Sequence, residues 1–96
     1  MTLAKHVSDE ELQRLYEVIA GISDPTQLRA LMEDICTIRE INELAQRLTV
    51  AFMLDAGESY ATIQEKTGAS ATTIARVSKC LNYGTGGYRS VMGSYS

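Results

Sequence analysis

The sequence is poor in several residue types, and each shortage excludes a class of protein. Its 96 residues include one proline, one phenylalanine and no tryptophan, and no low-complexity tract interrupts them. This composition argues against disorder, which goes with proline-rich and weakly hydrophobic sequence. No apolar run approaches the ~20 residues that cross a bilayer, and no charged segment followed by an apolar one marks the chain for export. We therefore expect a single cytoplasmic domain over residues 1–96 with no membrane contact.

Cysteine and histidine are also scarce. Cys36 and Cys80 are too few for a disulfide framework and belong to no CxxC or Cys/His cluster, so no metal site is expected. We expect both to be reduced, buried thiols that pack as small hydrophobic side chains. The one histidine, His6, lies in a predicted N-terminal extension of residues 1–7 and is expected to be an ordinary surface residue. No P-loop or dinucleotide-binding glycine motif is present, so the sequence predicts no enzyme.

The charge of the chain is unevenly distributed. The net charge of −3 does not by itself suit a DNA-binding protein. Residues 1–58, however, carry five basic and eleven acidic residues, a net charge of −6, whereas residues 59–96 carry four basic residues and one acidic residue, a net charge of +3. This asymmetry is typical of a basic nucleic-acid-binding segment attached to an acidic scaffold.

Helix-capping residues divide the first 57 residues into three helices. They are Ser8 with Glu11, Asp24 before Pro25, and Thr37 with Glu40. Serine or threonine followed three residues later by glutamate forms a capping box, and aspartate before proline suits a helix start. Gly57 then supplies the positive φ that ends the longest helix. No segment alternates as a strand does, so we expect an all-α fold.

The longest predicted helix has more apolar surface than one stripe. One stripe consists of Ile38, Ile41, Leu44, Ala45, Leu48, Ala51 and Phe52, and Val50, Met53 and Leu54 lie outside it. A small monomer cannot cover a face this wide, so residues 8–57 are predicted to form the dimerisation helices of a homodimer. The alternative is that the first two helices cover this surface within one chain.

Residues 59–82 have the pattern of a helix-turn-helix. Ser59 precedes one short helix, and the three residues Gly-Ala-Ser at 68–70 connect it to a second helix. Gly68 is expected to adopt a positive φ, which glycine does at no steric cost. The apolar residues expected to pack between the two helices are Ile63, Ile74, Val77 and Leu81.

The outer side of the second helix of this motif carries residues that could contact DNA. The candidate DNA contacts are Ser59, Tyr60, Lys66, Ser70, Ala71, Thr72, Thr73, Arg76 and Lys79. The N-terminal part of such a recognition helix enters the major groove, where an arginine such as Arg76 can donate two hydrogen bonds to guanine. Two positions, Gln64 and Thr67, are atypical, because such motifs usually have small or apolar residues there. A tight helical hairpin can also be a protein-interaction module that does not touch DNA, and this alternative stays open.

Residues 83–96 form a glycine-rich tail. Three of the six residues 83–88 are glycine, which is too many for a helix, and the chain from Gly93 to Ser96 is expected to fray. We expect Tyr83 and Tyr88 to pack the tail onto the body of the protein. A direct contact of the tail with the DNA backbone is the alternative.

Taken together, these segments resemble the Trp-repressor-like family, and specifically its YerC/YecD-like branch of small bacterial proteins. The resemblance covers most of the chain and is carried by residues 34–41 (DICTIREI), residues 44–47 (LAQR), the helix-turn-helix segment, and residues 81–88 (LNYGTGGY), which are specific to that branch. It implies an all-α fold, an intertwined homodimer and sequence-specific control of transcription as a repressor. Two-fold symmetry would place the paired recognition helices in successive major grooves, about 34 Å apart.

The resemblance also raises the question of a bound effector. In the tryptophan-responsive members a ligand lies between the long helix and the recognition helix, and two arginines of that pocket match Arg47 and Arg76. Val77 stands where the pocket has a glycine beneath the indole, and Cys80 stands where it has a serine on the ligand amine. A branched side chain and a weak hydrogen-bonding group both disfavour tryptophan, so no cofactor is predicted and the existence of another effector stays open. Without an effector, we expect Arg76 to contact DNA and Arg47 to pair with Glu43 or to pack through its stem.

Overall fold

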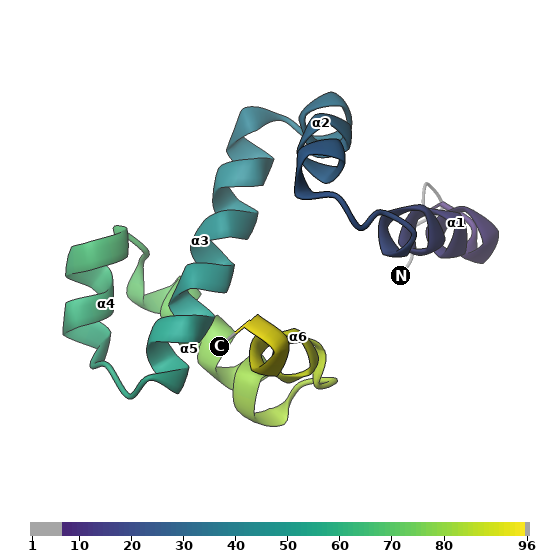
Figure 1. Cartoon of the computed structure of the whole chain (residues 1–96). Helices are drawn as coiled ribbons and strands as arrows, with labels where there is room; N and C mark the ends of the chain where they lie inside the picture. Colours follow the sequence, from purple (N-terminus) through teal and green to yellow (C-terminus); the bar gives the residue numbers. More distant parts are fainter. Residues whose placement is uncertain (1–6, 96) are drawn as a thin grey trace. The chain divides into compact units, whose positions relative to one another are not determined.

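The structure, a computed structural model, describes residues 7–95, which fold into six α-helices with no strand among them. The helices are α1 (Asp9–Ala20), α2 (Pro25–Ile35), α3 (Ile38–Asp55), α4 (Tyr60–Thr67), α5 (Ala71–Tyr83) and α6 (Gly87–Tyr95), and Figure 1 traces them along the chain. The predicted all-α fold is therefore confirmed. Residues 1–6, which include His6 and most of the predicted extension, and Ser96 lie outside the described residues.

Local capping chemistry sets the starts of α1 and α2 and the end of α3. Ser8 and Glu11 form the predicted capping box, since the N–H of Glu11 donates to Oγ of Ser8 at 3.1 Å and the N–H of Ser8 donates to Oε1 of Glu11 at 2.9 Å. The pKa of Glu11 is lowered, mainly because its carboxylate accepts a hydrogen bond from the Ser8 N–H, which stabilises the charged form. A hydrogen bond with the Ser8 side chain acts in the same direction. Asp24 caps the helix that begins at Pro25, as predicted. Gly57 has a φ of 85°, so the predicted left-handed end of α3 is confirmed.

The chain divides into two compact units, residues 1–37 and residues 38–96. In the first unit, α1 and α2 carry apolar residues at helical spacing, yet none of residues 7–37 is buried. Tyr16 is 60% exposed and Ile35 56% exposed, although both belong to the apolar faces of their helices. Residues 7–37 therefore contain no buried core within one chain. The single domain over residues 1–96 stays a prediction.

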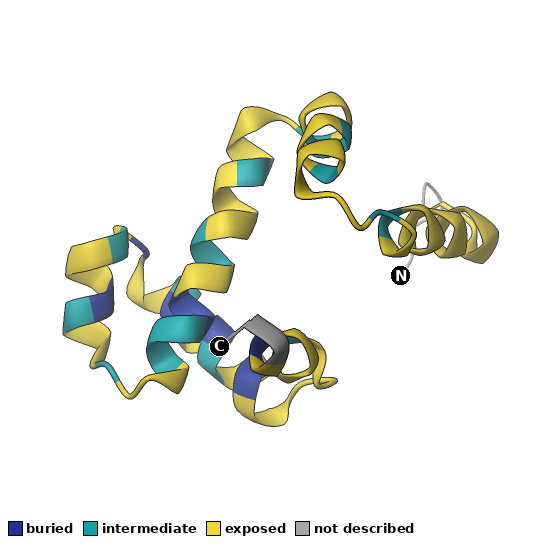
Figure 2. Ribbon diagram, in the orientation of Figure 1, coloured by how far each residue is buried: buried dark blue, intermediate teal, exposed yellow. Residues whose placement is uncertain are grey.

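The second unit contains the core of the molecule. α3 packs against α4, α5 and α6, and α5 packs against α4 and α6. The buried residues are Val50, Ala51, Ile63, Ala69, Ile74, Val77, Leu81 and Met92, and Figure 2 shows the buried positions gathered in this part of the chain. The predicted packing between the two helices of the helix-turn-helix is confirmed.

The predicted glycine-rich tail, residues 83–96, is largely helical, and the prediction that residues 83–88 are too glycine-rich for a helix holds only for residues 84–86. Residues 87–95 form α6, and the turn before it depends on Gly86, whose φ is 90°. Met92 is buried in the core, and Tyr88, one helical turn earlier, packs against the same core. This apolar burial outweighs the low helix propensity of glycine. The helix also continues through Gly93, where we expected the chain to fray.

Three side chains differ from expectation in their exposure. Tyr83 is 86% exposed and does not pack the tail onto the core, because it lies on the side of α5 opposite the buried Leu81. Cys80 is exposed and Cys36 is half-buried, so the prediction that both are buried is wrong. Both are free thiols, as expected.

The α6 helix yields a prediction on stability. Met92→Ala is expected to lower the free energy of unfolding by about 2 kcal/mol or more, because it leaves a cavity where α6 packs against α3 and α5. Chemical denaturation measured by circular dichroism checks this value. Tyr83→Ala is the control, since a highly exposed side chain should change stability by less than about 0.5 kcal/mol. Equal effects of the two substitutions would contradict the assignment of α6 to the core.

Candidate nucleic-acid interface

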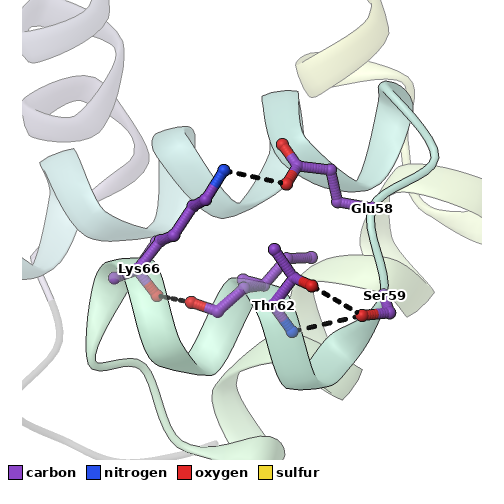
Figure 3. A network of polar contacts seen from close by, with 6 residues as sticks. Glu58, Ser59, Thr62 and Lys66 are labelled. Atoms are coloured by element: carbon purple, nitrogen blue, oxygen red, sulfur yellow. Dashed lines mark hydrogen bonds and ion pairs between the residues drawn. The ribbon is translucent and has the colours of Figure 1, made fainter.

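The two helices of the motif begin with identical serine caps. Oγ of Ser59 accepts the N–H of Thr62 at 3.1 Å and donates to Oγ1 of Thr62 at 3.0 Å (Figure 3). Oγ of Ser70 accepts the N–H of Thr73 at 3.1 Å and donates to Oγ1 of Thr73, also at 3.1 Å. Sequence analysis placed Ser59, Ser70 and Thr73 among the DNA contacts, and the structure gives their hydroxyls a role within the helix starts.

The turn between α4 and α5 explains the atypical Thr67. Its hydroxyl donates to the carbonyl of Ile63 at 2.6 Å and accepts the N–H of Ala69 at 3.1 Å. Its own carbonyl accepts a hydrogen bond of 3.1 Å from Nε2 of Gln46 on α3. Gly68, between them, has the predicted positive φ of 76°. Threonine therefore replaces the usual apolar residue because its polar atoms stabilise the turn.

The outer side of α5 is open to solvent. Ala71, Thr72, Arg76 and Lys79 are exposed, whereas Thr73 is half-buried beside its capping serine. The opposite side of α5 is buried in the core, so the helix cannot rotate about its axis without disrupting that core. The structure thus brings four of the predicted contacts onto one exposed face. Tyr60, at the start of α4, is 43% exposed.

Lys66, at the end of α4, has an acidic neighbour. Its Nζ lies 3.5 Å from Oε1 of Glu58 (Figure 3), and its side chain is 61% exposed. An exposed pair of this kind contributes about 0–1 kcal/mol. The ammonium group can therefore exchange this carboxylate for a phosphate at little cost.

A cavity of ≈ 240 Å³ lies between α3 and α5. It is lined by Glu43, Gln46, Arg47, Thr73 and Arg76, so the structure brings together the two arginines that the sequence predicted as effector contacts. Nε of Arg47 donates to the main-chain carbonyl of Glu43 at 3.3 Å rather than pairing with its carboxylate.

Two residues singled out for their effect on tryptophan binding lie elsewhere. Val77 is buried in the core, and Cys80 is exposed, and neither belongs to the cavity lining. Of the residues that do line the cavity, Glu43 has its carboxylate paired with Arg39 rather than with Arg47: Nε of Arg39 lies 3.4 Å from Oε2 of Glu43.

A link at the other end of α5 was missed by sequence reasoning. Nη1 of Arg89 on α6 lies 2.5 Å from Oδ1 of Asp55, the last residue of α3, and Nη2 lies 3.5 Å from Oδ1 of Asn82 near the end of α5. The sequence held no signal for this link, because residues 83–96 were not predicted to be helical. Residues 59–96 contain four basic residues, and one of them, Arg89, is thus already paired with a carboxylate.

Other kinds of site find no support within residues 7–95. No group of three or more histidine, cysteine, aspartate or glutamate side chains there could hold a metal ion. None of the helices in that range combines the length and apolar character needed to cross a bilayer.

Comparisons with known proteins give this chain relatives of the same architecture. The profile of a family described as "Trp repressor protein" matches residues 10–95. A Bacillus subtilis (strain 168) protein, described as the uncharacterised protein YerC, is 47% identical over 79 residues, which cover 82% of this chain and 76% of that protein. These matches confirm the resemblance seen in the sequence.

Two solved structures share the fold with a TM-score of 0.87 each. A crystallised protein from Staphylococcus aureus, described as a candidate Trp repressor, is 32% identical, with 99% of this chain and 95% of that chain covered. A protein from Eubacterium eligens ATCC 27750, described as TrpR-like, is 41% identical, with 92% of this chain and 91% of that chain covered.

The cap of α5 yields a prediction. Ser70→Ala is expected to lower the free energy of unfolding by about 1 kcal/mol, because the N–H of Thr73 loses its acceptor. Ser70→Asp, which keeps a capping acceptor and adds a favourable charge at the helix start, is expected to retain stability. Thermal and chemical denaturation of both variants test this, and an alanine variant as stable as the wild type would contradict the capping role.

Proposed function

Because this chain belongs to the Trp repressor family, whose members are transcription regulators rather than enzymes, we propose that it is a sequence-specific DNA-binding repressor that acts as a homodimer in the cytoplasm. The observation that supports this most is the outer side of α5, where Thr72, Arg76 and Lys79 are exposed while the other side is fixed in the core. A helix held in this way can enter a major groove without rearrangement.

Each exposed group has a chemical role in the proposal. Ala71 permits close approach and can touch a thymine methyl, and Arg76 can donate a bidentate pair to O6 and N7 of guanine. Thr72 and Lys79 can bind bases or phosphates along the same face. Tyr60 and Lys66 contribute phosphate contacts from α4, with the serine-capped helix starts of α4 and α5 beside them.

Charge supports the same surface. Residues 59–96 carry a net charge of +3 against −6 for residues 1–58. Arg89 is paired with Asp55, and Lys66 is loosely paired with Glu58. The positive charge of the exposed face therefore rests mainly on Arg76 and Lys79, so the protein should depend on few phosphate contacts per copy.

A homodimer would bury apolar surface that is exposed in a single chain. None of residues 7–37 is buried, and Leu44, Leu48 and Val91 are each more than 40% exposed in the second unit. Leu48, Thr49, Phe52, Met53 and Val91 line an apolar groove of ≈ 460 Å³ between α3 and α6. We propose that a second copy covers this groove, which would also pair the two recognition helices for one duplex.

A small-molecule effector is a separate part of the proposal. The cavity with Arg47 and Arg76 offers two cations to an anionic group, but its five lining residues are all polar. An indole ring would find no apolar side chain to pack against among these residues, so tryptophan is not proposed as the corepressor.

The proposal predicts different effects for two cations. Arg76→Ala is expected to weaken binding to the preferred duplex about tenfold and to relax sequence preference, because a bidentate base contact is lost. Lys66→Ala is expected to weaken binding about equally across sequences and to lower the salt slope by about one. Selection from randomised duplexes, followed by titration at several salt concentrations, measures both effects.

Arg29→Ala is the matched control for this experiment. Arg29 is an exposed cation on α2, paired with Glu33 at 2.9 Å, so its loss removes the same charge from a residue outside the motif. Unchanged preference in the Arg76 variant would remove that residue from base contact. Absence of salt-dependent DNA retention by the wild type, with loss of a protein partner in the Arg76→Ala and Lys79→Ala variants, would favour the protein-interaction module instead.

The homodimer has its own test. Leu48→Asp places a charge in the apolar groove and is expected to give a monomer mass by light scattering at micromolar concentration, because an unpaired buried carboxylate disfavours association. Tyr83→Asp is the control, since that side chain lies outside the groove, and it should stay dimeric. A monomer mass for the wild type would contradict the proposed homodimer.

A further inference from the structure

One hydrogen bond joins the long helix α3 to the turn of the helix-turn-helix. Thr67 is the last residue of α4, where main-chain carbonyls have no partner within the helix. Nε2 of Gln46 supplies that partner at 3.1 Å, although the two residues are 21 positions apart. Both groups are partly buried, so water does not fully replace the bond if it is lost.

The groups around this carbonyl are fixed in turn. The Thr67 hydroxyl bonds the carbonyl of Ile63 at 2.6 Å and the N–H of Ala69 at 3.1 Å, and Ala69 is only 4% exposed. The next residue, Ser70, caps α5. The carbonyl that accepts the bond from Gln46 therefore lies three residues before the N-cap of the recognition helix.

We propose that Gln46 is a positioning residue for the DNA interface: it holds the α4–α5 turn against α3 and so fixes the N-terminal end of α5. The inference rests on the proposed function, because it is this end of a recognition helix that contacts base edges. Gln46 itself contacts no DNA in this scheme. It acts through Thr67 on the placement of Thr72 and Arg76.

The chemistry of the link explains why a hydrogen-bond donor is required. Apolar contacts of Ile63, Ala69 and Ile74 hold the turn and α5 in the core, but burial of apolar surface is not directional and allows small shifts. A hydrogen bond weakens steeply as its angle departs from linearity, so it defines position. At the other end of α5, Arg89 links Asn82 to Asp55. Loss of the Gln46 bond should therefore free the N-terminal end of α5 more than its C-terminal end.

Three variants test the inference. Gln46→Met keeps the length of the side chain and removes the donor, and Gln46→Glu replaces the donor by a carboxylate that repels the Thr67 carbonyl. Gln13→Met is the matched control, because Gln13 on α1 donates a similar bond of 3.0 Å to Glu17 outside the motif. Amide hydrogen exchange is measured residue by residue, and DNA affinity is measured on a duplex selected with the wild type.

The expected result separates positioning from folding. In Gln46→Met the protection of the Gly68 and Ala69 amides should fall about fivefold, while that of Val50 on α3 and of Leu81 near the C-terminal end of α5 stays as in the wild type. The Kd for the selected duplex should rise about three- to tenfold, which matches the loss of one hydrogen bond. Gln46→Glu should give at least the same changes, and Gln13→Met should give neither.

Two outcomes would overturn the inference alone. One is unchanged protection at the turn in both Gln46 variants, and the other is lowered protection with DNA affinity and sequence preference equal to those of the wild type. Absence of DNA binding by the wild-type protein would instead overturn the proposed function, and with it any role of Gln46 at DNA. The exchange measurement would still establish whether the link holds the turn.

Discussion

The burial of one side of α5 is the constraint on which the rest of the second unit depends. Ile74, Val77 and Leu81 recur at helical spacing and are buried against α3, α4 and α6. A helix with three residues buried in a core cannot rotate about its axis, so the orientation of its opposite face is fixed as well. Arg76 and Lys79 are exposed for that reason, not through any interaction of their own.

Hydrogen bonds and ion pairs, which are directional, then restrict the small shifts of α5 that apolar burial allows. Gln46 holds the turn before α5 through the carbonyl of Thr67, and Arg89 connects the far end of α5 to Asp55. The two links differ in setting, because the first is partly buried and the second lies on the surface. A surface ion pair contributes little to stability, so of the two links the one at Gln46 should restrain the helix more. That is also the end where base recognition is expected.

Sequence reasoning succeeded where the structure depends on neighbours along the chain. The capping box of Ser8 and Glu11 and the left-handed glycines at 57 and 68 involve residues at most a few positions apart, and all were predicted correctly. It failed where distant contacts decide. The helix α6 forms because Met92 reaches a core made by other helices, and nothing in the local glycine content signals this. The partner of Thr67 lies 21 residues earlier, so an atypical residue could be noticed but not explained.

The first unit gives the proposed dimer a further physical meaning. None of residues 7–37 is buried, so α1 and α2 gain no core from their own chain. In the proposed dimer, apolar surface of the second copy would supply the free energy that orders their apolar faces. Each copy offers only a few exposed cations to DNA, and a single recognition helix with so few phosphate contacts would bind weakly. Two helices on one rigid dimer make the second contact intramolecular and raise the affinity without any new interaction. Dimer formation and DNA recognition are thus coupled in this proposal, because the same apolar faces that remain open in one chain would set the spacing of the two recognition helices.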